Sequence, residues 1–500
     1  MGKSIMVQGT ASSAGKSLLV TALCRIFLQD GHKIAPFKSQ NMSLNSFITR
    51  EGLEMGRAQV VQAEAAGINP AVCMNPILLK PTTDRKSQVI VEGKVLRNMD
   101  AVEYFAFKNS LRGIVEKNFN VLKDTYDITV IEGAGSPAEI NLKENDIVNM
   151  GMAHIADCPV IIVADIDRGG VFASIYGTYM LLDDDEKARV KGFVINKFRG
   201  DIDILKPGID EIEGILGVPI LGVIPYLDIN IEDEDSLTDR FNSGLADSAN
   251  PNDAPAKIRV IKLPHISNFT DMDVFKLFDV DMRFVKNSDE IDDADILIIP
   301  GTKNTIDDLL FLKEKGFDRA IQRLHEKDCL IAGICGGFQM LGTLIEDPHM
   351  IESDSLSVDG LGLLDIKTVM LKDKTTRQIE VEITDNEGVL KGSVGMKITG
   401  YEIHMGSTTY DDKASFINSE NRDAGIVKDN VIGTYIHGFF DNVEFTRNLL
   451  NVICRRKGIA DNVKTGGYNE FKRKEYDRLA AAVRNSIDMD AVYRILNNGA

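Results

Sequence analysis

The sequence lacks several features that mark particular classes of protein. Among 500 residues there is no tryptophan, and the six cysteines include no CxxC pair. Neither a disulfide framework nor a zinc site is therefore indicated, and free thiols are expected. No apolar run reaches the roughly 18 residues that span a bilayer. The opening stretch MGKSIMVQGT has too few apolar residues for a secretory signal, so we expect a cytoplasmic protein without a membrane partner.

Positive charge is also scarce. The chain has 75 acidic and 57 basic residues, and its formal net charge is -18. This balance argues against nucleic acid or an anionic membrane as the main partner, and an anionic small substrate would need a local basic patch. The composition, 44% hydrophobic and 26% charged, is typical of a soluble globular protein. Because 500 residues exceed what one core usually organises, two or more domains are expected.

Short β-branched runs alternate with longer helical patterns, which predicts βαβ units and parallel sheets covered by helices on both faces. The first series consists of SIMVQG, DITVIEG, PVIIVAD, KGFVINK and ILGVIP. A second series consists of KIRVIKLP, DILIIPGT, CLIAGI and VIGTYI. The predicted fold class is α/β, with two doubly wound parallel-sheet domains.

A change in composition suggests where the domains meet. Residues 228–256 are first acidic and then rich in Asn, Ser, Asp and Pro, as in a surface linker. We therefore predict a first domain over residues 1–227 and a second over 257–456. The remaining residues, 457–500, show amphipathic patterns and are predicted to form a helical extension.

The first predicted strand leads into the glycine-rich stretch GTASSAGKS, which a helical pattern follows. Clustered backbone N–H groups, a lysine ammonium and a serine hydroxyl for Mg²⁺ are what phosphate binding requires. The spacing is one residue longer than in GxxxxGK[ST], but strand, loop and helix fall where the mechanism needs them. The residues of this stretch predicted to bind ATP are Gly9, Thr10, Ser13, Gly15, Lys16 and Ser17.

Two later strand ends supply candidates for further nucleotide contacts. Glu132 in VIEGAGSP is predicted to hold Mg²⁺ together with Ser17. Asn196 in VINK is predicted to read the adenine edge, although a polar residue that merely closes a strand is an equally good reading of it. Ligands of open α/β sheets bind at the carboxyl ends of the strands, which favours the functional reading.

A cysteine stands between a predicted strand and two glycines in GICGGFQMLG. A residue on such a sharp strand-to-helix turn presents its side chain outward, and small neighbours are needed at the crowded bend. The dipole of the following helix favours a thiolate there, so Cys335 is the predicted nucleophile. We expect the amides of Gly336 and of Gly301, in the PGTKNT turn, to form the oxyanion hole.

A cysteine nucleophile needs a base, and His437 in YIHGFFD follows a late predicted strand. His404 and His265 are competing candidates, and the sequence prefers His437 only modestly. The other cysteines are expected to be packing residues.

Taken together, these motifs resemble known families. The Cys335 elbow with a downstream histidine resembles class I glutamine amidotransferases, and the N-terminal half resembles dethiobiotin-synthetase-like P-loop proteins. Their combination resembles the cobyric acid synthase family. The stretches that carry this resemblance are PFKSQNMSLNS (36–46), EMGRAQVVQAEAAG (54–67), NPILLKP (75–81), EGAGSPAEINL (132–142), ADIDRGGVFAS (164–174), INKFRGD (195–201), PGTKNT (300–305) and GTYIHGFFD (433–441).

This resemblance implies a glutamine amidoligase that uses ATP, Mg²⁺ and L-glutamine. The implied substrate is adenosylcobyrinic acid a,c-diamide, whose b, d, e and g carboxylates are amidated to give adenosylcobyric acid. Ammonia is released by Cys335 and His437. The substrate-side candidates lie in the family-specific stretches and are Lys38, Gln40, Asn41, Arg57 and Lys80.

One position departs from the family pattern. Many relatives carry a glutamate two residues after the histidine, but this chain has Phe439. His437 then works in a dyad or is oriented by another group such as Asp441. Two further functions stay open: an a,c-diamide synthase that amidates two other carboxylates, and a P-loop ATPase switch. The switch fits less well, since TASSAGKS lacks an early lysine and such proteins have no need for the elbow.

Overall fold

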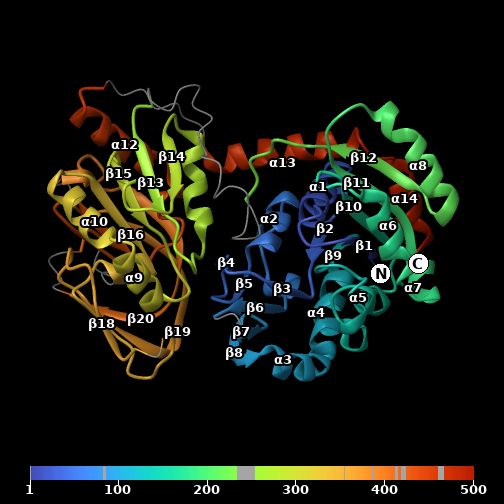
Figure 1. Ribbon diagram of the computed structural model, residues 1–500, viewed down its shortest axis with the longest axis horizontal. Coiled ribbons are helices and arrows are strands. Elements are labelled where there is room, and N and C mark those ends of the chain that lie inside the picture. Colours follow the sequence, from blue (N-terminus) through green and yellow to red (C-terminus); the bar gives the residue numbers. More distant parts are fainter. Residues whose placement is uncertain are drawn as a thin grey trace. The chain divides into compact units, whose positions relative to one another are not determined.

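The computed structural model forms two compact units, each with its own parallel sheet (Figure 1). It describes residues 2–82, 86–232, 254–353, 355–385, 388–410, 415–417, 424–459 and 467–499. The first unit comprises Met1–Ser43, Glu54–Glu234 and Lys472–Ala500, and the second comprises Leu44–Leu53 and Asp235–Phe471. The predicted α/β class with two parallel-sheet domains is confirmed.

Each unit is built from more than one segment of the chain, whereas each domain predicted from the sequence is one continuous range. Residues 44–53 join the second unit, and the C-terminal residues from 472 onward join the first. Composition cannot reveal such exchanges, because they depend on tertiary packing. Most of the predicted linker, residues 233–253, lies outside the described part of the chain.

The central sheet of the first unit has the order β12-β11-β10-β1-β9-β2, with all strands parallel. Its strands are β1 (Lys3–Gly9), β2 (Ile34–Phe37), β9 (Ile128–Glu132), β10 (Val160–Asp165), β11 (Val190–Phe198) and β12 (Ile220–Pro225). All five predicted runs form strands, and only β2 was not predicted. Near-complete burial of Val7, Val130 and Val163 fits strands covered on both faces.

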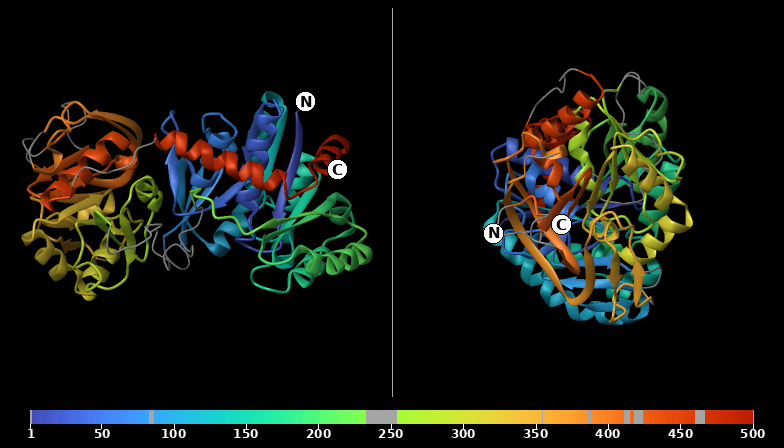
Figure 2. Two further views of the ribbon diagram at one scale, coloured as in Figure 1. Left: turned by 90° about the horizontal axis from the view of Figure 1, so that it is seen from above. Right: turned by 90° about the vertical axis from the view of Figure 1, so that its left-hand side faces the viewer.

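Helices cover this sheet and complete its core. They are α1 (Lys16–Gln29), α2 (Arg57–Ala65), α4 (Arg112–Thr125), α5 (Met150–Ala156), α6 (Val171–Met180), α7 (Asp184–Arg189), α8 (Ile202–Leu216), most of α13 (Tyr468–Arg484) and α14 (Met489–Asn498). Leu479, Val483 and Leu496 of the last two helices pack in one apolar cluster with Ile5 and Val7 of β1. The end of α14 accordingly lies near the start of β1, where Lys3 donates a hydrogen bond to Asn497 (Figure 2).

A smaller mixed sheet of the first unit has the order β3-β6-β7-β8 and was not predicted. Its strands are β3 (Gln40–Met42), β6 (Ile77–Pro81), β7 (Lys86–Val91) and β8 (Lys94–Asp100). The short strand β5 (Glu54–Gly56) precedes α2, and α3 (Ala101–Lys108) follows β8. Asp100 and Glu103 form a reciprocal capping box at the start of α3, which explains where that helix begins.

The main sheet of the second unit has the order β14-β13-β15-β16-β22-β21, and only the β21–β22 pair is antiparallel. Its strands are β13 (Lys257–Ile261), β14 (Asp281–Val285), β15 (Ile296–Ile299), β16 (Leu330–Ile334), β21 (Gly425–Lys428) and β22 (Val431–Thr434). The four predicted runs became β13, β15, β16 and β22. The unit's helices are α9 (Thr305–Glu314), α10 (Phe317–Glu326), α11 (Gly336–Met340) and α12 (Val443–Arg456).

A second sheet of this unit, ordered β18-β17-β19-β20, also escaped prediction. Its strands are β17 (Leu344–Glu346), β18 (Ser357–Asp359), β19 (Lys367–Glu382) and β20 (Lys397–Thr409). The short strand β4 (Ser46–Ile48) lies in the segment 44–53. In the described part of the chain, no helix is long and apolar enough to cross a bilayer.

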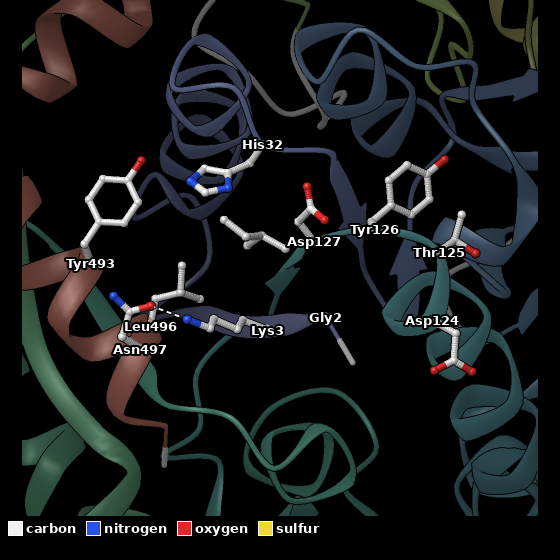
Figure 3. A pocket seen from close by; sticks show the side chains of 11 residues that line it. Gly2, Lys3, His32, Asp124, Thr125, Tyr126, Asp127, Tyr493, Leu496 and Asn497 are labelled. Atoms are coloured by element: carbon white, nitrogen blue, oxygen red, sulfur yellow. Dashed lines mark hydrogen bonds between the residues drawn. The ribbon is translucent and has the colours of Figure 1, made fainter.

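A cavity of about 550 Å³ lies in the first unit beside α14 (Figure 3). Its lining includes Lys3 and Ile128, which begin β1 and β9, together with Tyr493 of α14. The cavity is therefore at the amino ends of parallel strands. Nucleotide sites of such sheets form at the carboxyl ends, so this cavity is separate from the loop at Gly9.

Candidate active site

The loop after β1 has the geometry of a phosphate cradle. Gly15 has a φ of 104°, and α1 begins at the next residue. A Cβ atom at Gly15 would lie 1.9 Å from Nδ2 of Asn196, so only glycine fits there. The Nζ of Lys16 donates to the carbonyls of Ala11 at 3.0 Å and Gly135 at 2.9 Å. The ammonium thus lies over the loop, where it can meet a phosphate in place of these carbonyls.

The carboxylate of Glu132 is the centre of a buried polar cluster beside this loop. Its Oε1 accepts hydrogen bonds from Oγ of Ser17 and Nζ of Lys38, both at 2.8 Å. Its Oε2 accepts one from Nε2 of Gln62. Glu132 is only 1% exposed, so the Lys38 ammonium balances a buried charge.

The adjacent oxygens of Ser17 and Glu132 fit a Mg²⁺ ion. Mg²⁺ prefers hard oxygen ligands, and it usually takes one or two from the protein while water and substrate phosphates supply the rest. The described residues include no cluster of three or more His, Cys, Asp or Glu side chains that could hold a metal alone. Ser17 and Glu132 could therefore hold a metal only together with other ligands such as water or a nucleotide, and this role stays a prediction.

The end of β11 supports the loop from the other side. The Nδ2 of Asn196 donates to the carbonyl of Ala14 at 3.0 Å, and Lys197 reaches the carbonyl of Ser13 and the carboxylate of Asp165, both at 2.8 Å. Asn196 thus contacts the predicted nucleotide loop directly. Its role toward adenine stays a prediction.

The predicted substrate-side residues fall into separate environments. Gln40 accepts a hydrogen bond from Tyr104 at 2.6 Å, and Asn41 donates to Gln59 at 3.2 Å. Lys38 belongs to the Glu132 cluster described above. Each of these polar contacts lies in the first unit, near the end of β2 or in β3.

Two of the basic candidates are buried in ion pairs. Arg57 forms two hydrogen bonds with Glu232, at 2.5 and 2.9 Å, and Lys80 pairs with Glu54 at 3.0 Å. Their charges are thus balanced inside the unit. A polycarboxylate would have to compete with these carboxylates, so substrate binding by Arg57 and Lys80 stays a prediction.

The second unit contains the predicted strand–turn–helix elbow. Cys335 has φ 52° and ψ −109°, a strained backbone conformation, and it joins β16 directly to α11. A Cβ atom at Gly337 would lie 2.0 Å from the carbonyl oxygen of Ile299, and one at Gly336 would lie 2.6 Å from Cγ2 of Thr302. The glycine pair is therefore required by close approach of the neighbouring turn.

His437 lies next to Cys335 and pairs with a carboxylate. Its Nδ1 is 2.7 Å from Oδ2 of Asp271, whose Oδ1 accepts the N–H of Gly438 at 2.9 Å. Cys335 is close enough to His437 to raise its pKa. The Cys335 side chain, 7% exposed, contacts the carbonyl of Ile403 at 3.5 Å. Cys335, His437 and Asp271 have the arrangement of a nucleophile, a base and an orienting acid.

The surroundings of His437 determine its charge. Burial by itself lowers the pKa of this imidazole, but the Asp271 carboxylate, its hydrogen bond to the ring and the neighbouring Cys335 outweigh burial and raise the pKa to about 10. His437 therefore favours the imidazolium form near neutral pH, and an imidazolium stabilises a neighbouring thiolate. By contrast, burial raises the pKa of Cys158 to about 12, as expected for a packing cysteine.

Sequence reasoning missed Asp271. The residue lies in a 3-10 helix, Phe269–Leu277, which follows β13 far from the histidine in sequence. The one available signal was Phe439, because a missing glutamate after the histidine implies a carboxylate from elsewhere. The sequence left open whether His437 works in a dyad or is oriented by a residue such as Asp441. In the structure the carboxylate at its Nδ1 is that of Asp271.

The remaining candidates of this unit can also be located. His265 pairs with Asp308 at 2.8 Å, and His404 stacks on Tyr435 with ring centroids 3.7 Å apart. Gly301 lies beside the base, since a Cβ atom there would be 3.1 Å from Cε1 of His437. Gly336 directly follows Cys335, so the two predicted oxyanion residues lie beside the nucleophile and its base.

Comparison with known proteins agrees with this geometry. Residues 5–237 match the model of a CobQ/CobB/MinD/ParA nucleotide binding domain, and residues 257–445 match that of a CobB/CobQ-like glutamine amidotransferase domain. The chain is 53% identical to a cobyric acid synthase of Caldanaerobacter subterraneus subsp. tengcongensis, over 99% of both chains. It is 50% identical to that of Clostridium acetobutylicum, over 98% of both, and 51% identical to that of Lachnoclostridium phytofermentans, over 100% of both. The chain belongs to the cobyric acid synthase family.

Proposed function

We propose that this protein amidates the b, d, e and g carboxylates of adenosylcobyrinic acid a,c-diamide, with ATP as energy source and glutamine as nitrogen donor, to give adenosylcobyric acid. One observation carries the proposal. A chain that is similar over its whole length to cobyric acid synthases holds both a phosphate loop with Glu132 beside it and a Cys335–His437–Asp271 triad.

The triad accounts for the release of ammonia. The proton of the Cys335 thiol passes to His437, which gives the thiolate–imidazolium pair that the raised pKa of His437 favours, and the thiolate attacks the amide carbon of glutamine. The C–N bond breaks as the imidazolium returns the proton to the leaving ammonia. Water then hydrolyses the glutamyl thioester, which gives glutamate and free thiol. Asp271 holds the Nδ1 proton and the ring orientation throughout, and the amides of Gly301 and Gly336 stabilise the oxyanion.

The nucleotide site accounts for activation of the acid. A carboxylate is a poor acyl donor, so its oxygen attacks the γ-phosphorus of ATP, ADP leaves and an acyl phosphate forms. Ammonia then attacks the acyl carbon, loses a proton and displaces phosphate, which leaves the amide. Lys16 and Lys38 balance negative charge on the transferred group. Ser17 and Glu132 would hold Mg²⁺, which would neutralise charge on the phosphate oxygens.

The test is an incubation with ATP, Mg²⁺, glutamine and the a,c-diamide, followed by mass spectrometry of the corrinoid. Successive replacement of hydroxyl by amino groups at the b, d, e and g positions is expected. With Cys335→Ala, glutamine should fail and ammonium salts should still support amidation. ATP turnover without any change in the corrinoid would contradict the proposal and favour the ATPase switch.

A further inference from the structure

Residues 44–53 are part of the glutaminase unit, although the chain on both sides of them belongs to the nucleotide-binding unit. Ile48 is fully buried and packs with Tyr401, Ile403 and Phe47 in one apolar cluster. Side chains of β19 bind the segment's main chain: Gln378 donates to the carbonyl of Ile48, and Thr376 donates to that of Gly52 at 2.9 Å. The segment is therefore an integral part of the second unit's packing.

The main chain of Ser46 binds two residues that touch the catalytic histidine. Its N–H donates to Oδ1 of Asn268 at 2.9 Å, and its carbonyl accepts the hydroxyl of Tyr401 at 2.9 Å. The Nδ2 of Asn268 lies 3.3 Å from Nε2 of His437. The Tyr401 ring stacks on the imidazole with a centroid separation of 5.2 Å and an interplanar angle of 24°. Asn268 and Tyr401 are only 2% and 4% exposed.

The Ser46 N–H also fixes which way the Asn268 amide points. A backbone N–H can only donate, so the amide must turn its oxygen toward Ser46 and its NH₂ group toward His437. The NH₂ group then faces Nε2, the nitrogen that exchanges protons with Cys335. Without Ser46, the amide could turn and offer its oxygen to a protonated Nε2, which would favour the imidazolium. The position of the Ser46 main chain therefore affects both the orientation and the protonation of His437.

We propose that Asn268 and Tyr401 are positioning residues for His437, and that residues 44–53 hold them in place. Both ends of this segment continue covalently into the nucleotide-binding unit, and Lys38 of the Glu132 cluster precedes it by a few residues. A change in the nucleotide-binding unit can therefore reach His437 through this segment. This inference rests on the proposed glutaminase activity.

The test compares Ser46→Pro with Ser46→Ala. Proline removes the N–H that Asn268 accepts, and it is tolerated at the first residue of a strand such as β4. Alanine keeps the N–H. For Ser46→Pro we expect kcat for glutamine to fall about tenfold with KM within about twofold of wild type. We also expect ATP and corrinoid to stimulate glutamine hydrolysis in the wild-type protein, and this stimulation should be lost in Ser46→Pro. Amidation driven by ammonium salts and the activity of Ser46→Ala should persist.

Tyr401→Phe gives a second, milder measurement because it removes only the hydroxyl that binds Ser46 and keeps the ring on His437. The same lowered kcat and weakened stimulation are expected, with Tyr179→Phe in the first unit as the matched control. Wild-type kcat and stimulation in both Ser46→Pro and Tyr401→Phe would overturn the proposal. So would a fall in activity that merely follows a lower melting temperature with stimulation intact. A wild-type protein that hydrolyses no glutamine would instead refute the proposed function itself.

Discussion

The Nδ1 atom of His437 lies 2.7 Å from Oδ2 of Asp271, although 166 residues separate the two in the chain. Both side chains are buried, and the same carboxylate also accepts the N–H of Gly438. The carboxylate thus fixes the ring and the backbone that carries it. This arrangement assigns the orienting role that the chain's Phe439 cannot fill.

Replacing Asp271 by asparagine should therefore impair glutamine use selectively. The amide can no longer hold the Nδ1 proton as a charged acceptor, so kcat for glutamine should fall roughly 10²–10⁴-fold, while ammonia-dependent amidation continues. Asp441→Asn is the control, and it should retain glutaminase activity. Steady-state assays with glutamine and with ammonium salts check both variants. If Asp441→Asn proved the more damaging change, the assignment of Asp271 would be wrong.

The charge on His437 should make stability depend on pH. Its pKa in the folded protein is raised to about 10, against about 6.5 when unfolded, so the folded state binds the extra proton. The stabilisation is complete below about pH 6.5 and is lost as pH rises through about pH 10, with a slope of at most about 1.4 kcal/mol per pH unit. Urea unfolding across this range measures it. His437→Gln should flatten the curve, and the exposed His349→Gln should not.

The glycine after the elbow should be intolerant of a methyl group. In Gly337→Ala the new Cβ would meet the main-chain oxygens of Ile299 and Pro300, which cannot move aside as a flexible side chain can. We expect a loss of about 3 kcal/mol or more together with loss of glutaminase activity. The control is Gly214→Ala in α8, where a Cβ meets no atom within 4 Å. That change should stabilise the protein by about 0.5–1 kcal/mol. Equal melting temperatures for the two variants would contradict this account.

Substitutions at the Lys38–Glu132 ion pair should show that its effect on stability differs from its effect on activity. Lys38→Met leaves a buried carboxylate without its counterion, which should cost about 3–5 kcal/mol, whereas a double change to Lys38→Met and Glu132→Gln should recover much of that loss. Neither protein should amidate the corrinoid with glutamine or with ammonia, because both lack a charge needed at the phosphoryl group. Glutaminase activity should survive in the double variant. Restored amidation there would show that the pair is purely structural.

Periodicity and turn composition were sufficient to predict most strands of the two main sheets and the two glycine-rich turns, but not β2, β14 and β21. Strands such as β1, β10 and β16 are continuous apolar runs, and Gly15, Gly336 and Gly337 stand where the backbone is most crowded. These features depend on neighbouring residues alone, so they can be recognised from the sequence. Short or polar strands such as β3 and β8 satisfy no periodicity strongly enough to be predicted.

The parts that could not be predicted depend on contacts between distant residues. Asp271 is one polar residue among several after β13, and only the folded chain brings it to His437. The pairing of Arg57 with Glu232 likewise joins residues 175 apart and gives a buried partner to a residue that the sequence suggested for substrate binding. The exchange of segments between the units could not be predicted for the same reason. No local pattern shows that residues 44–53 belong to the second unit while the residues on both sides belong to the first.

The return of residues 472–500 to the first unit has a consequence for biosynthesis. Leu479, Val483 and Leu496 fill the apolar layer against β1, whose residues are translated long before these three. That layer stays incomplete until α13 and α14 leave the ribosome. The apolar surface of the first unit is therefore partly exposed while the whole glutaminase unit is translated. A nascent chain stalled before residue 472 should therefore bind chaperones through its N-terminal half even when its second half has already folded.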